Sequence, residues 1–187
     1  MQPLPTLKTE RLVLRPLARG DAAAVRALGD ERRVAEMTLL PHPFGEEDTQ
    51  RWIEKRMEWA AKGRSRPFSM LLGTDGTLVG QAGLVIDHEN EKAGLYYWLG
   101  VAYWGRGYAT EAARELIRHA FEDLHLGRVY ADHFARNPAS GRVLEKVGMR
   151  CEGRLRRDFK KWDRFEDMVL YGILAEEWPP ATPSIPG

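Results

Sequence analysis

Two spacings of apolar residues divide the chain into predicted strands and predicted helices. Short apolar or alternating runs are typical of strands, and apolar residues at every third or fourth position are typical of helices. Residues 74–77 (Thr-Asp-Gly-Thr) separate two of the strand runs, and an Asp-Gly pair there predicts a hairpin turn. The expected strands lie at residues 10–15, 68–72, 78–86, 94–99, 128–134, 149–156 and 166–174.

Helices are expected between these strands, at residues 21–28, 46–61, 107–126 and 137–147. Asp21 is placed to cap the first helix, and Gly29 to end it. Asn137, followed by proline, is a typical start for the last helix, and Gly148 is its expected end. Residues 37–45, which contain two prolines, are expected to form a loop.

The order of these elements predicts an α/β (α+β) fold. Hairpin-linked strands imply antiparallel pairing, whereas the strand–helix–strand unit at 94–134 implies one parallel pair. We therefore expect a mixed, mostly antiparallel sheet of about seven strands with helices on both faces. Within the 187 residues, we expect one domain at 7–175, a short tail at 1–6 and a proline-rich tail at 176–187.

Composition narrows the class of protein. The net charge of +1, from 28 basic and 27 acidic residues, argues against binding of nucleic acid or a membrane surface by charge. No apolar run approaches the roughly 20 residues that span a bilayer, and the N-terminus has no signal-peptide pattern. The single cysteine, Cys151, excludes an internal disulfide and is expected to be a small apolar residue in a strand. We therefore expect a cytoplasmic protein.

The candidate chemistry lies where the strand at 94–99 passes through a glycine-rich turn into the long helix. The first N–H groups of a helix have no partner within it, and the helix dipole places about half a positive charge there. Such an end binds anions, usually phosphate. Gly105 and Gly107 let the backbone approach the anion, and Arg106 adds a cation. Residues 104–110 are therefore the predicted phosphate site.

Two common phosphate-binding motifs do not match this turn. A dinucleotide-binding fold needs G-x-G-x-x-G beside the first strand of a parallel array, whereas this turn has two glycines and lies in mid-chain after antiparallel strands. A P-loop needs a Gly-Lys-Ser or Gly-Lys-Thr ending, which the turn lacks. The anion is therefore expected to belong to another kind of ligand.

The turn and the order of elements resemble the GCN5-related N-acetyltransferases (GNAT). The acyl-CoA turn of that family follows Gln/Arg-x-x-Gly-x-Gly/Ala. It matches residues 104–109, with Gly107 and Ala109 at the two small positions. Trp104 stands where the family usually has Gln or Arg, so the resemblance implies a backbone cradle there rather than a side-chain contact with phosphate.

A second motif points to one branch of that family. Residues 137–149 (NPASGRVLEKVGM) resemble the Asn-x-x-Ser…Lys-x-Gly-Phe segment of the RimJ/RimL type, which acetylates the N-termini of ribosomal proteins. Residues 7–16 and 167–171 also resemble that branch. The similarity therefore covers about residues 7–175.

The resemblance implies that acetyl-CoA binds where the sheet splays between the strands at 94–101 and 128–135. It places the pantetheine arm along the backbone of residues 99–101 and the pyrophosphate at residues 105–110. Asn137 and Ser140 would lie beside the thioester. The expected cofactor-binding residues are Leu99, Gly100, Val101, Trp104, Gly105, Arg106, Gly107, Tyr108, Ala109, Thr110, Asn137 and Ser140.

The family's reaction is direct attack of a neutral amine on the thioester in a ternary complex. It needs an oxyanion donor, expected from the backbone of Val101 or its neighbour, and a proton donor for the departing thiolate. Asn137 and Ser140 are the expected catalytic side chains. Many relatives carry a glutamate base in the strand before the turn, where this chain has Gly94. The remaining candidates for the base are His88, Glu89, Glu91, His133 or water.

The sequence leaves the amine acceptor open. The resemblance implies the N-terminus of a protein, and the alternative is a small amine such as a polyamine, an amino acid or an antibiotic. A non-catalytic acyl-CoA-binding sensor is a second alternative, supported by the missing glutamate. His42, His119 and His125 have no paired ligand spacing, so no metal is expected. The protein is expected to be a monomer or a homodimer.

Overall fold

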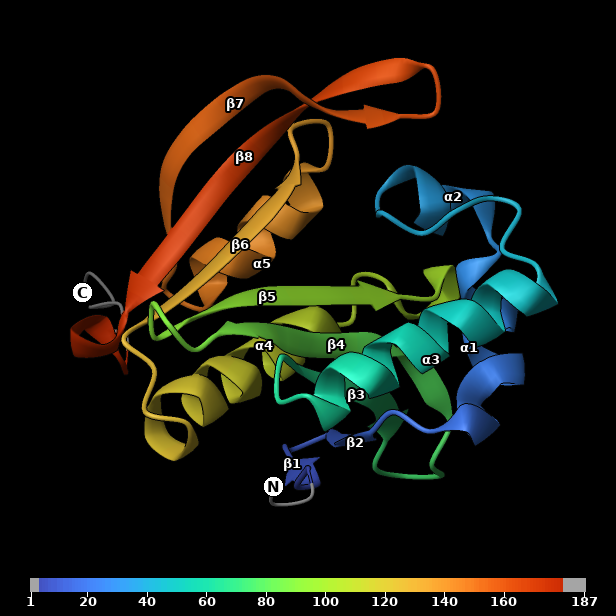
Figure 1. Cartoon of the computed structure of the whole chain (residues 1–187), viewed down its shortest axis with the longest axis horizontal. Coiled ribbons are helices and arrows are strands. Elements are labelled where there is room, and N and C mark those ends of the chain that lie inside the picture. The colour runs from blue at the N-terminus through green and yellow to red at the C-terminus, as the bar shows by residue number, and fades with distance from the viewer. Residues whose placement is uncertain (1–3, 180–187) are drawn as a thin grey trace, which may run out of the picture.

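The computed structural model describes residues 4–179, which form one eight-stranded sheet (Figure 1). The strand order is β1-β2-β3-β4-β5-β6-β8-β7, and β5 with β6 is its parallel pair. The sheet confirms the expected mixed, mostly antiparallel architecture. The strands are β1 (Leu7–Lys8), β2 (Leu12–Pro16), β3 (Ser65–Leu72), β4 (Leu78–Asp87), β5 (Lys92–Leu99), β6 (Arg128–Phe134), β7 (Arg150–Lys161) and β8 (Arg164–Leu174).

The strand count exceeds the expected seven because of β1. Its two residues pair with Leu14 and Val13 of β2, and two residues are too few to show alternation in a sequence. Strand β7 is also longer than expected. It pairs with β8 in a hairpin that is interrupted by irregularities at Cys151/Gly153 and Leu155/Phe159. Its polar, mostly exposed residues carry no apolar period by which its length could be predicted.

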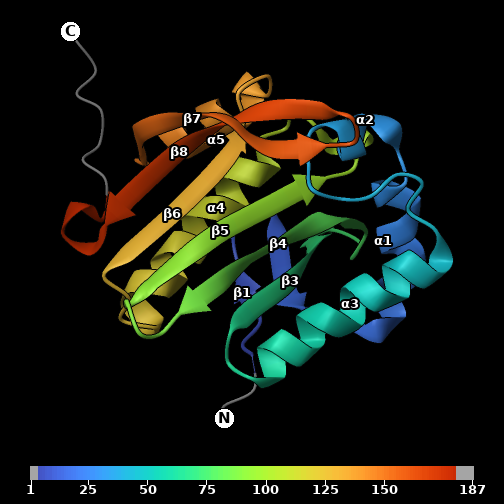
Figure 2. The same ribbon diagram turned by 45° about the horizontal axis from the view of Figure 1, so that its top comes forward.

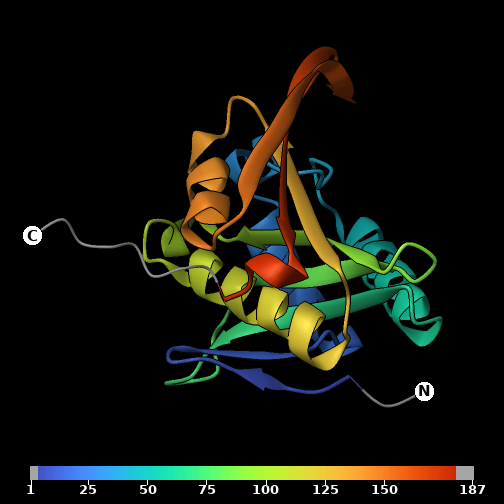
Figure 3. The same ribbon diagram turned by 90° about the vertical axis from the view of Figure 1, so that its left-hand side faces the viewer.

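Helices lie on both faces of the sheet, as expected. Helices α4 (Tyr108–Arg118) and α5 (Pro138–Lys146) lie on one face. Helices α1 (Ala22–Gly29), α2 (Arg32–Glu36) and α3 (Glu46–Ala61) lie on the other (Figure 2). Figure 3 separates the orange α5 from the teal α3 across the strands. Helix α3 has the bounds that the sequence predicts, whereas α2 was not expected.

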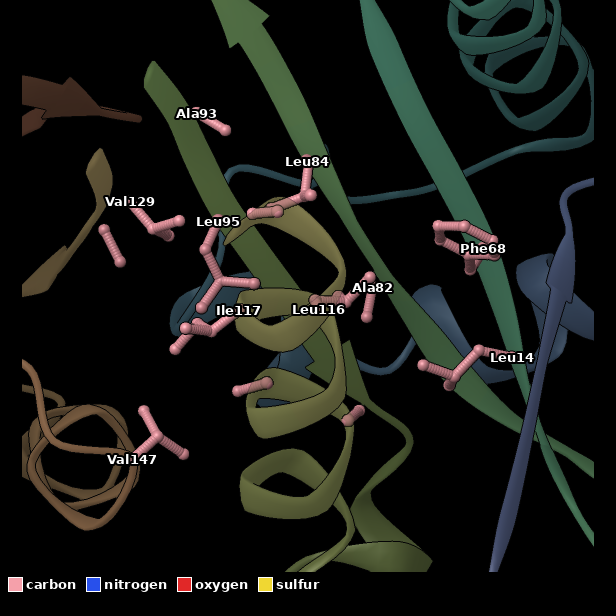
Figure 4. Packing of buried hydrophobic residues seen from close by; sticks show 14 of the residues in the cluster. Leu14, Phe68, Ala82, Leu84, Ala93, Leu95, Leu116, Ile117, Val129 and Val147 are labelled. Atoms are coloured by element: carbon pink, nitrogen blue, oxygen red, sulfur yellow. The ribbon is translucent and has the colours of Figure 1, made fainter. Parts of the chain in front are cut away.

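The larger of the two hydrophobic cores lies between α4 and the sheet (Figure 4). Leu116 and Ile117 of this helix are fully buried against Leu84 and Leu95 of the sheet. The helix continues as a π-helical turn over His119–Asp123, so its regular part ends earlier than the expected residue 126. A second cluster on the opposite face contains Val25, Val34, Leu40, Phe44 and Trp98. The side chains of β5 are therefore divided between two cores.

Asp21 does not cap α1, and that expectation is wrong. Its carboxylate makes no hydrogen bond to the first turn of the helix. Instead it accepts hydrogen bonds from Arg15 Nη1 at 2.9 Å, Ser69 Oγ at 2.6 Å and the Ala18 N–H at 3.0 Å. A buried carboxylate needs such donors more than a helix end does, because a buried charge without partners is costly. Asp21 thereby joins β2 to β3.

Two further expectations concern Cys151, which is exposed, and the two tails, which the structure describes only in part. Cys151 lies in a strand, as expected, but its side chain is exposed rather than packed, because β7 is an edge strand. The expected tails at 1–6 and 176–187 lie partly outside the described residues, which omit 1–3 and 180–187. Trp178 packs against Phe121 with ring centroids 6.3 Å apart. None of the described helices is long and apolar enough to cross a membrane.

The sheet opens between β5 and β6. Their parallel pairing is limited to Lys92↔Arg128, Ala93↔Val129 and Gly94↔Tyr130. Beyond these pairs, β6 runs diagonally away from β5 (Figure 1). Each strand continues for four or more residues without the other, so the backbone groups that face the opening are left free for a ligand. The expected splay between these two strands is therefore present.

Candidate functional site

The glycine-rich turn forms the anion cradle that its sequence predicts. Gly105 and Gly107 have φ of 74° and 83°, in the left-handed region that favours glycine. The first helical hydrogen bond runs from the Glu111 N–H to the Gly107 carbonyl at 3.1 Å. The N–H groups of residues 108–110 therefore have no acceptor within α4, and they lie at the positive end of its dipole.

Arg11, from the turn between β1 and β2, braces this cradle from the side. Its Nη1 donates to the Arg106 carbonyl at 2.9 Å, which holds that oxygen away from the open N–H groups. A Cβ on Gly107 would lie 3.2 Å from Arg11 Nη2, so the guanidinium borders the space above the turn. The guanidinium also lies 4.9 Å from the centre of the Tyr108 ring. This side-chain contact could not be predicted from the sequence, because about 95 residues separate Arg11 from the turn.

Glu111 is the partner of Arg11 in this contact, and its negative charge is compensated there. Its carboxylate accepts from Thr9 Oγ1 at 2.5 Å, and from the backbone N–H and Nε of Arg11, both at 2.7 Å. Burial alone would raise the pKa of Glu111, but these hydrogen bonds outweigh it and hold the pKa below its usual range. A carboxylate in the first turn of α4 is thereby neutralised, and the cradle stays favourable for an anion.

A cavity of about 570 Å³ occupies the opening between β5 and β6. Its walls come from β5, β6, α3, the start of α5 and the segment after α2. Six of the expected cofactor-binding residues line it: Leu99, Trp104, Gly105, Ala109, Asn137 and Ser140. The other six, Gly100, Val101, Arg106, Gly107, Tyr108 and Thr110, belong to the turn and helix start that lie next to it. The structure thus brings the two predicted motifs together around one space.

Ser140 and Asn137 lie at the start of α5, beside the cavity. Asn137 caps the helix, as expected, because its side-chain oxygen accepts from the Ser140 N–H at 3.3 Å. The Ser140 hydroxyl lies 2.8 Å from the Tyr97 hydroxyl of β5, across the opening. Burial raises the pKa of Tyr97, and its hydrogen bond with Ser140 opposes this only in part. Tyr97 therefore keeps its proton at neutral pH. The sequence favoured a core role for this tyrosine over a place in the wall of a substrate site.

Some backbone groups of residues 99–101 already form hydrogen bonds within the protein. Trp104 Nε1 donates to the Leu99 carbonyl at 2.9 Å, and the Gly100 N–H donates to the Val79 carbonyl at 3.0 Å. Val101 begins a 3-10 turn, Val101–Tyr103, in which the first N–H has no internal acceptor. Of these residues, Val101 has its backbone N–H best placed to meet a ligand.

Three candidates for the base lie away from the cavity. His88, Glu89 and Glu91 are in the turn between β4 and β5, at the closed end of the opening, and His88 Nε2 lies 2.8 Å from the Gly63 carbonyl. His133 lies beside the cavity, but its buried ring packs on Tyr171 and on Gly141 of α5. Of the four candidates, His133 is therefore the one that lines the cavity, and its buried Nε2 has no hydrogen-bond partner among residues 4–179.

Asp132 of β6, which contributes the carboxylate of the cavity lining, is a further residue that the sequence did not indicate. The walls of the cleft desolvate it, and this effect together with the nearby Asp158 carboxylate raises the pKa of Asp132, against an opposing effect of His133. Gly94, where the resemblance would place a glutamate base, offers little space for a side chain. A Cβ there would lie 3.1 Å from the Tyr130 ring.

Comparison with known proteins identifies the family. Residues 11–150 match the model of the acetyltransferase (GNAT) domain. The N-acetyltransferase p20 of Bacillus licheniformis is 30% identical over 92% of this chain and 98% of its own. The FsC-acetyl coenzyme A-N(2)-transacetylase of Aspergillus fumigatus is 33% identical over 93% of this chain and 78% of its own. RimJ of Mycobacterium smegmatis, solved in complex with CoA-disulfide, superposes with a TM-score of 0.81 at 29% identity, over 90% of this chain and 84% of that one.

The chain belongs to the GNAT acetyltransferase family, and its structural neighbours include the RimJ/RimL type. It is an acetyl-CoA-dependent N-acetyltransferase with acetyl-CoA as its co-substrate. Within residues 4–179, no group of three or more His, Cys, Asp or Glu residues is arranged to hold a metal ion.

Proposed function

We propose that the protein transfers an acetyl group from acetyl-CoA to an α-amine by direct attack in a ternary complex. The observation that carries this proposal is the joining of the anion cradle to a cleft that contains a hydroxyl pair and a single lining carboxylate. The α-amine belongs to a protein N-terminus or to a small molecule. We further propose a cytoplasmic protein that acts as a monomer or a homodimer.

The residues of the turn fit the pyrophosphate of acetyl-CoA. Residues 105–110 would hold it with main-chain N–H groups, since a Cβ on Gly107 would fill part of the space that the anion needs. Arg11 would contribute a positive charge from the side. Acetyl-CoA supplies an activated acetyl thioester when bound, and the splay between β5 and β6 leads from the turn to Ser140.

The residues near the thioester would stabilise the negative charge that develops on the carbonyl oxygen and on the leaving sulfur. The Val101 N–H would donate to the carbonyl oxygen as negative charge develops on it. The Ser140 hydroxyl would donate a proton or a hydrogen bond to the leaving thiolate, whose ordinary pKa is near 8.5. The protonated Tyr97 hydroxyl, 2.8 Å away, would return a proton to Ser140. Asn137 fixes this end of α5 and so orients Ser140.

The site offers few candidates for a general base, and this supports an α-amine rather than a lysine side chain as the acceptor. A lysine-type amine has a pKa of about 10.4, and making it neutral at pH 7 costs about 4–5 kcal/mol. An α-amine, with a pKa near 8, costs much less. Arg56, Arg136 and Arg142 outnumber the single lining carboxylate, which disfavours a polycationic acceptor.

The experiment that tests the proposal measures release of CoA thiol from acetyl-CoA over a panel of peptides, amino acids, polyamines and aminoglycosides. We expect turnover to require the amine and to favour α-amines, with an intersecting pattern of initial-rate lines that indicates a ternary complex. Tight binding of acetyl-CoA without thiol release on any amine would overturn the proposal in favour of a sensor. Parallel lines would instead indicate an acetylated enzyme.

A further inference from the structure

The acceptor side of the cavity lies on the face of the sheet opposite α4. Leu95 of β5 and Ala131 of β6 pack in the core beneath α4, so the side chains that follow each of them lie on the other face. The last pair before the opening is Gly94↔Tyr130. Two residues further on, Tyr96 and Asp132 therefore occupy matching positions across the opening, and both line the cavity.

Arg56 of α3 stands on the Tyr96 side of this space without an anionic partner. Its guanidinium lies 4.0 Å from the centre of the Trp52 ring and 4.7 Å from that of Tyr96, between the two rings. Its Nε is buried and has no hydrogen-bond partner among residues 4–179, and no described carboxylate forms an ion pair with the side chain. Burial lowers the pKa of Arg56 and Tyr96 opposes this, so the two rings offset the cost of desolvating the guanidinium only in part.

The other arginines of the lining differ from Arg56. Arg136 is paired with Glu166 at 2.9 Å and donates to the Glu36 carbonyl, so it is a structural link between β8 and α2. Arg142 of α5 lines the cavity too, but its side chain is exposed to solvent. Among the described arginines of the lining, Arg56 is thus the one that is partly buried, with a buried Nε, and has no anionic partner, so it can bind a negatively charged group of a ligand.

Asp132 supplies the opposite charge on the facing wall. It forms no ion pair with Arg56, and Asp158 and His133 are the ionisable groups whose charges shift its pKa. A cation and an anion therefore share one cavity without neutralising each other. A ligand with a carboxylate at one end and an ammonium at the other would satisfy both, because a charge that is partly desolvated is stabilised by a partner of opposite charge.

We propose that the acceptor is a free α-amino acid with an apolar side chain, its carboxylate bound by Arg56 and its amine by Asp132. This inference rests on the proposed acetyl transfer and names its substrate class. The apolar side chain would lie among the aromatic residues of the lining, which include Trp98 and Phe134. A peptide N-terminus has an amide where the free amino acid has its carboxylate, and it would leave Arg56 unpaired.

The roof of the cavity also favours a small acceptor. The segment after α2 is tied across the opening by three donors from the other wall. Asn137 Nδ2 reaches the Met37 carbonyl at 3.5 Å, Lys161 Nζ donates to the Leu40 carbonyl, and Arg136 donates to the Glu36 carbonyl. These links hold the segment against the cavity that it lines, so a small acceptor would fit without displacing it.

The proton balance is simple in this arrangement. The bound ammonium gives one proton to the Asp132 carboxylate, and the raised pKa of that group makes it a better acceptor of this proton. The neutral nitrogen then forms the N–C bond to the acetyl carbon as the C–S bond breaks. The second nitrogen proton passes to solvent as the amide forms. The leaving sulfur gains a proton from Ser140, which Tyr97 and then solvent replace. The products are an N-acetylamino acid and CoA thiol.

The test compares two acceptors that differ in one charge. L-phenylalanine and L-phenylalaninamide share the amine and the side chain, and the amide has the lower amine pKa, which by itself favours its reaction. We expect wild-type kcat/KM to be at least about tenfold higher for the acid. Arg56→Gln should reverse this preference, and Arg56→Lys should restore part of it. Arg51→Gln, on the outer side of the same helix, is the matched control and should keep the wild-type ratio.

Several outcomes would overturn the inference. These are an equal or higher rate for the amide or for a Phe-Gly-Gly peptide, and an equal loss for acid and amide in Arg56→Gln. If no amine is acetylated, the proposed function fails, and fluorescence titration of the acetyl-CoA complex with L-phenylalanine still decides the inference. Binding that Arg56→Gln abolishes would support the two-charge site, whereas no binding, or binding that Arg56→Gln leaves intact, would overturn it.

Discussion

Gly107 determines the anion cradle through its backbone alone. Its φ of 83° turns the chain into α4, and the space beside it is bordered by Arg11. A side chain at this position would therefore act in two ways: it strains the turn and it occupies the place of the ligand.

We predict that Gly107→Glu lowers the affinity for CoA more than about 100-fold, because a carboxylate would occupy the position of the phosphate beside Arg11. Equilibrium binding measured by calorimetry checks this. Gly76→Glu is the matched control, since Gly76 has a similar φ of 72° and open space around it, in the turn between β3 and β4. Equal affinity of the two variants would count against the cradle.

Ser140 and Tyr97 form a hydroxyl pair whose members come from opposite walls of the cleft. We predict that Ser140→Ala lowers kcat by about 10²-fold and changes the affinity for CoA much less, because the proton donor acts only as the thiolate leaves. Tyr97→Phe should lower kcat in the same direction by a smaller factor.

Rapid-reaction kinetics at saturating acetyl-CoA separates these effects. Tyr130→Phe is a suitable control, because Tyr130 lies on β6 outside the cavity lining. A proportional loss of kcat and CoA affinity in Ser140→Ala would assign Ser140 to binding alone. An unchanged kcat in Tyr97→Phe would remove Tyr97 from the proton path.

At the scale of elements, the link between the β1–β2 turn and α4 is the feature with the most direct bearing on cofactor binding. Thr9, Arg11 and Glu111 join the start of the chain to the start of the cofactor helix. The link orients the Arg106 carbonyl before any ligand arrives, which lowers the cost of ordering the turn on binding.

We predict that Arg11→Gln weakens CoA binding by about tenfold or more, through loss of a charged hydrogen bond and of the nearby positive charge, while kcat at saturating acetyl-CoA stays within about threefold. Titration with acetyl-CoA at two salt concentrations measures this loss and its electrostatic share. Arg19→Gln is the control, because Arg19 is exposed and pairs only with Glu54 at 3.7 Å. If both variants bind alike, Arg11 does not serve the cradle.

The elements themselves were largely predictable, because their residues show clear periods. Helix α3 was predicted to the residue, since its acidic first turn and Gly63 mark both ends. Asn137 and Gly148 likewise predicted the ends of α5. Strand β1 and helix α2 are too short for a period to be recognised.

The candidate site was predictable only where its chemistry is local in the chain. The turn at 104–110 and the segment at 137–149 each carry their signal in consecutive residues, and the structure brings them to one cleft. Arg11, Arg56 and Asp132 have no such signal. Their places depend on pairing between distant strands and on the packing of α3, which a single sequence does not reveal.

At the scale of the whole molecule, the buried cluster of Asp21, Arg15 and Ser69 joins the first strands of the sheet to the layer of α1. Burial raises the pKa of Asp21, but hydrogen bonds from Arg15, Ser69 and Ala18 outweigh it and hold the pKa below its ordinary value. The carboxylate therefore stabilises the fold at pH values above the unfolded pKa of about 3.9. That contribution is lost as the pH falls through the lower folded pKa.

We predict that Asp21→Asn lowers the free energy of unfolding at pH 7 by about 2–3 kcal/mol, because Arg15 loses its charged partner. The difference from wild type should shrink as the pH falls below about 4. Urea denaturation across pH 3–7 measures both effects. Asp163→Asn, in the exposed turn between β7 and β8, is the control, and a difference between Asp21→Asn and wild type that stays constant with pH would contradict the argument.

The three residue pairs that join β5 to β6 have a mechanical consequence for the whole protein. In the part of the chain that the structure describes, strands β6, β8 and β7 are hydrogen-bonded to the rest of the sheet only through these three pairs at one end of β5. The two parts of the sheet therefore face each other across the gap. A pantetheine chain lying in the gap would act as a ninth strand that bridges them. Ligand loading should therefore slow deuterium uptake by the amides of residues 131–134 far more than by those of β3, which are already laddered on both sides.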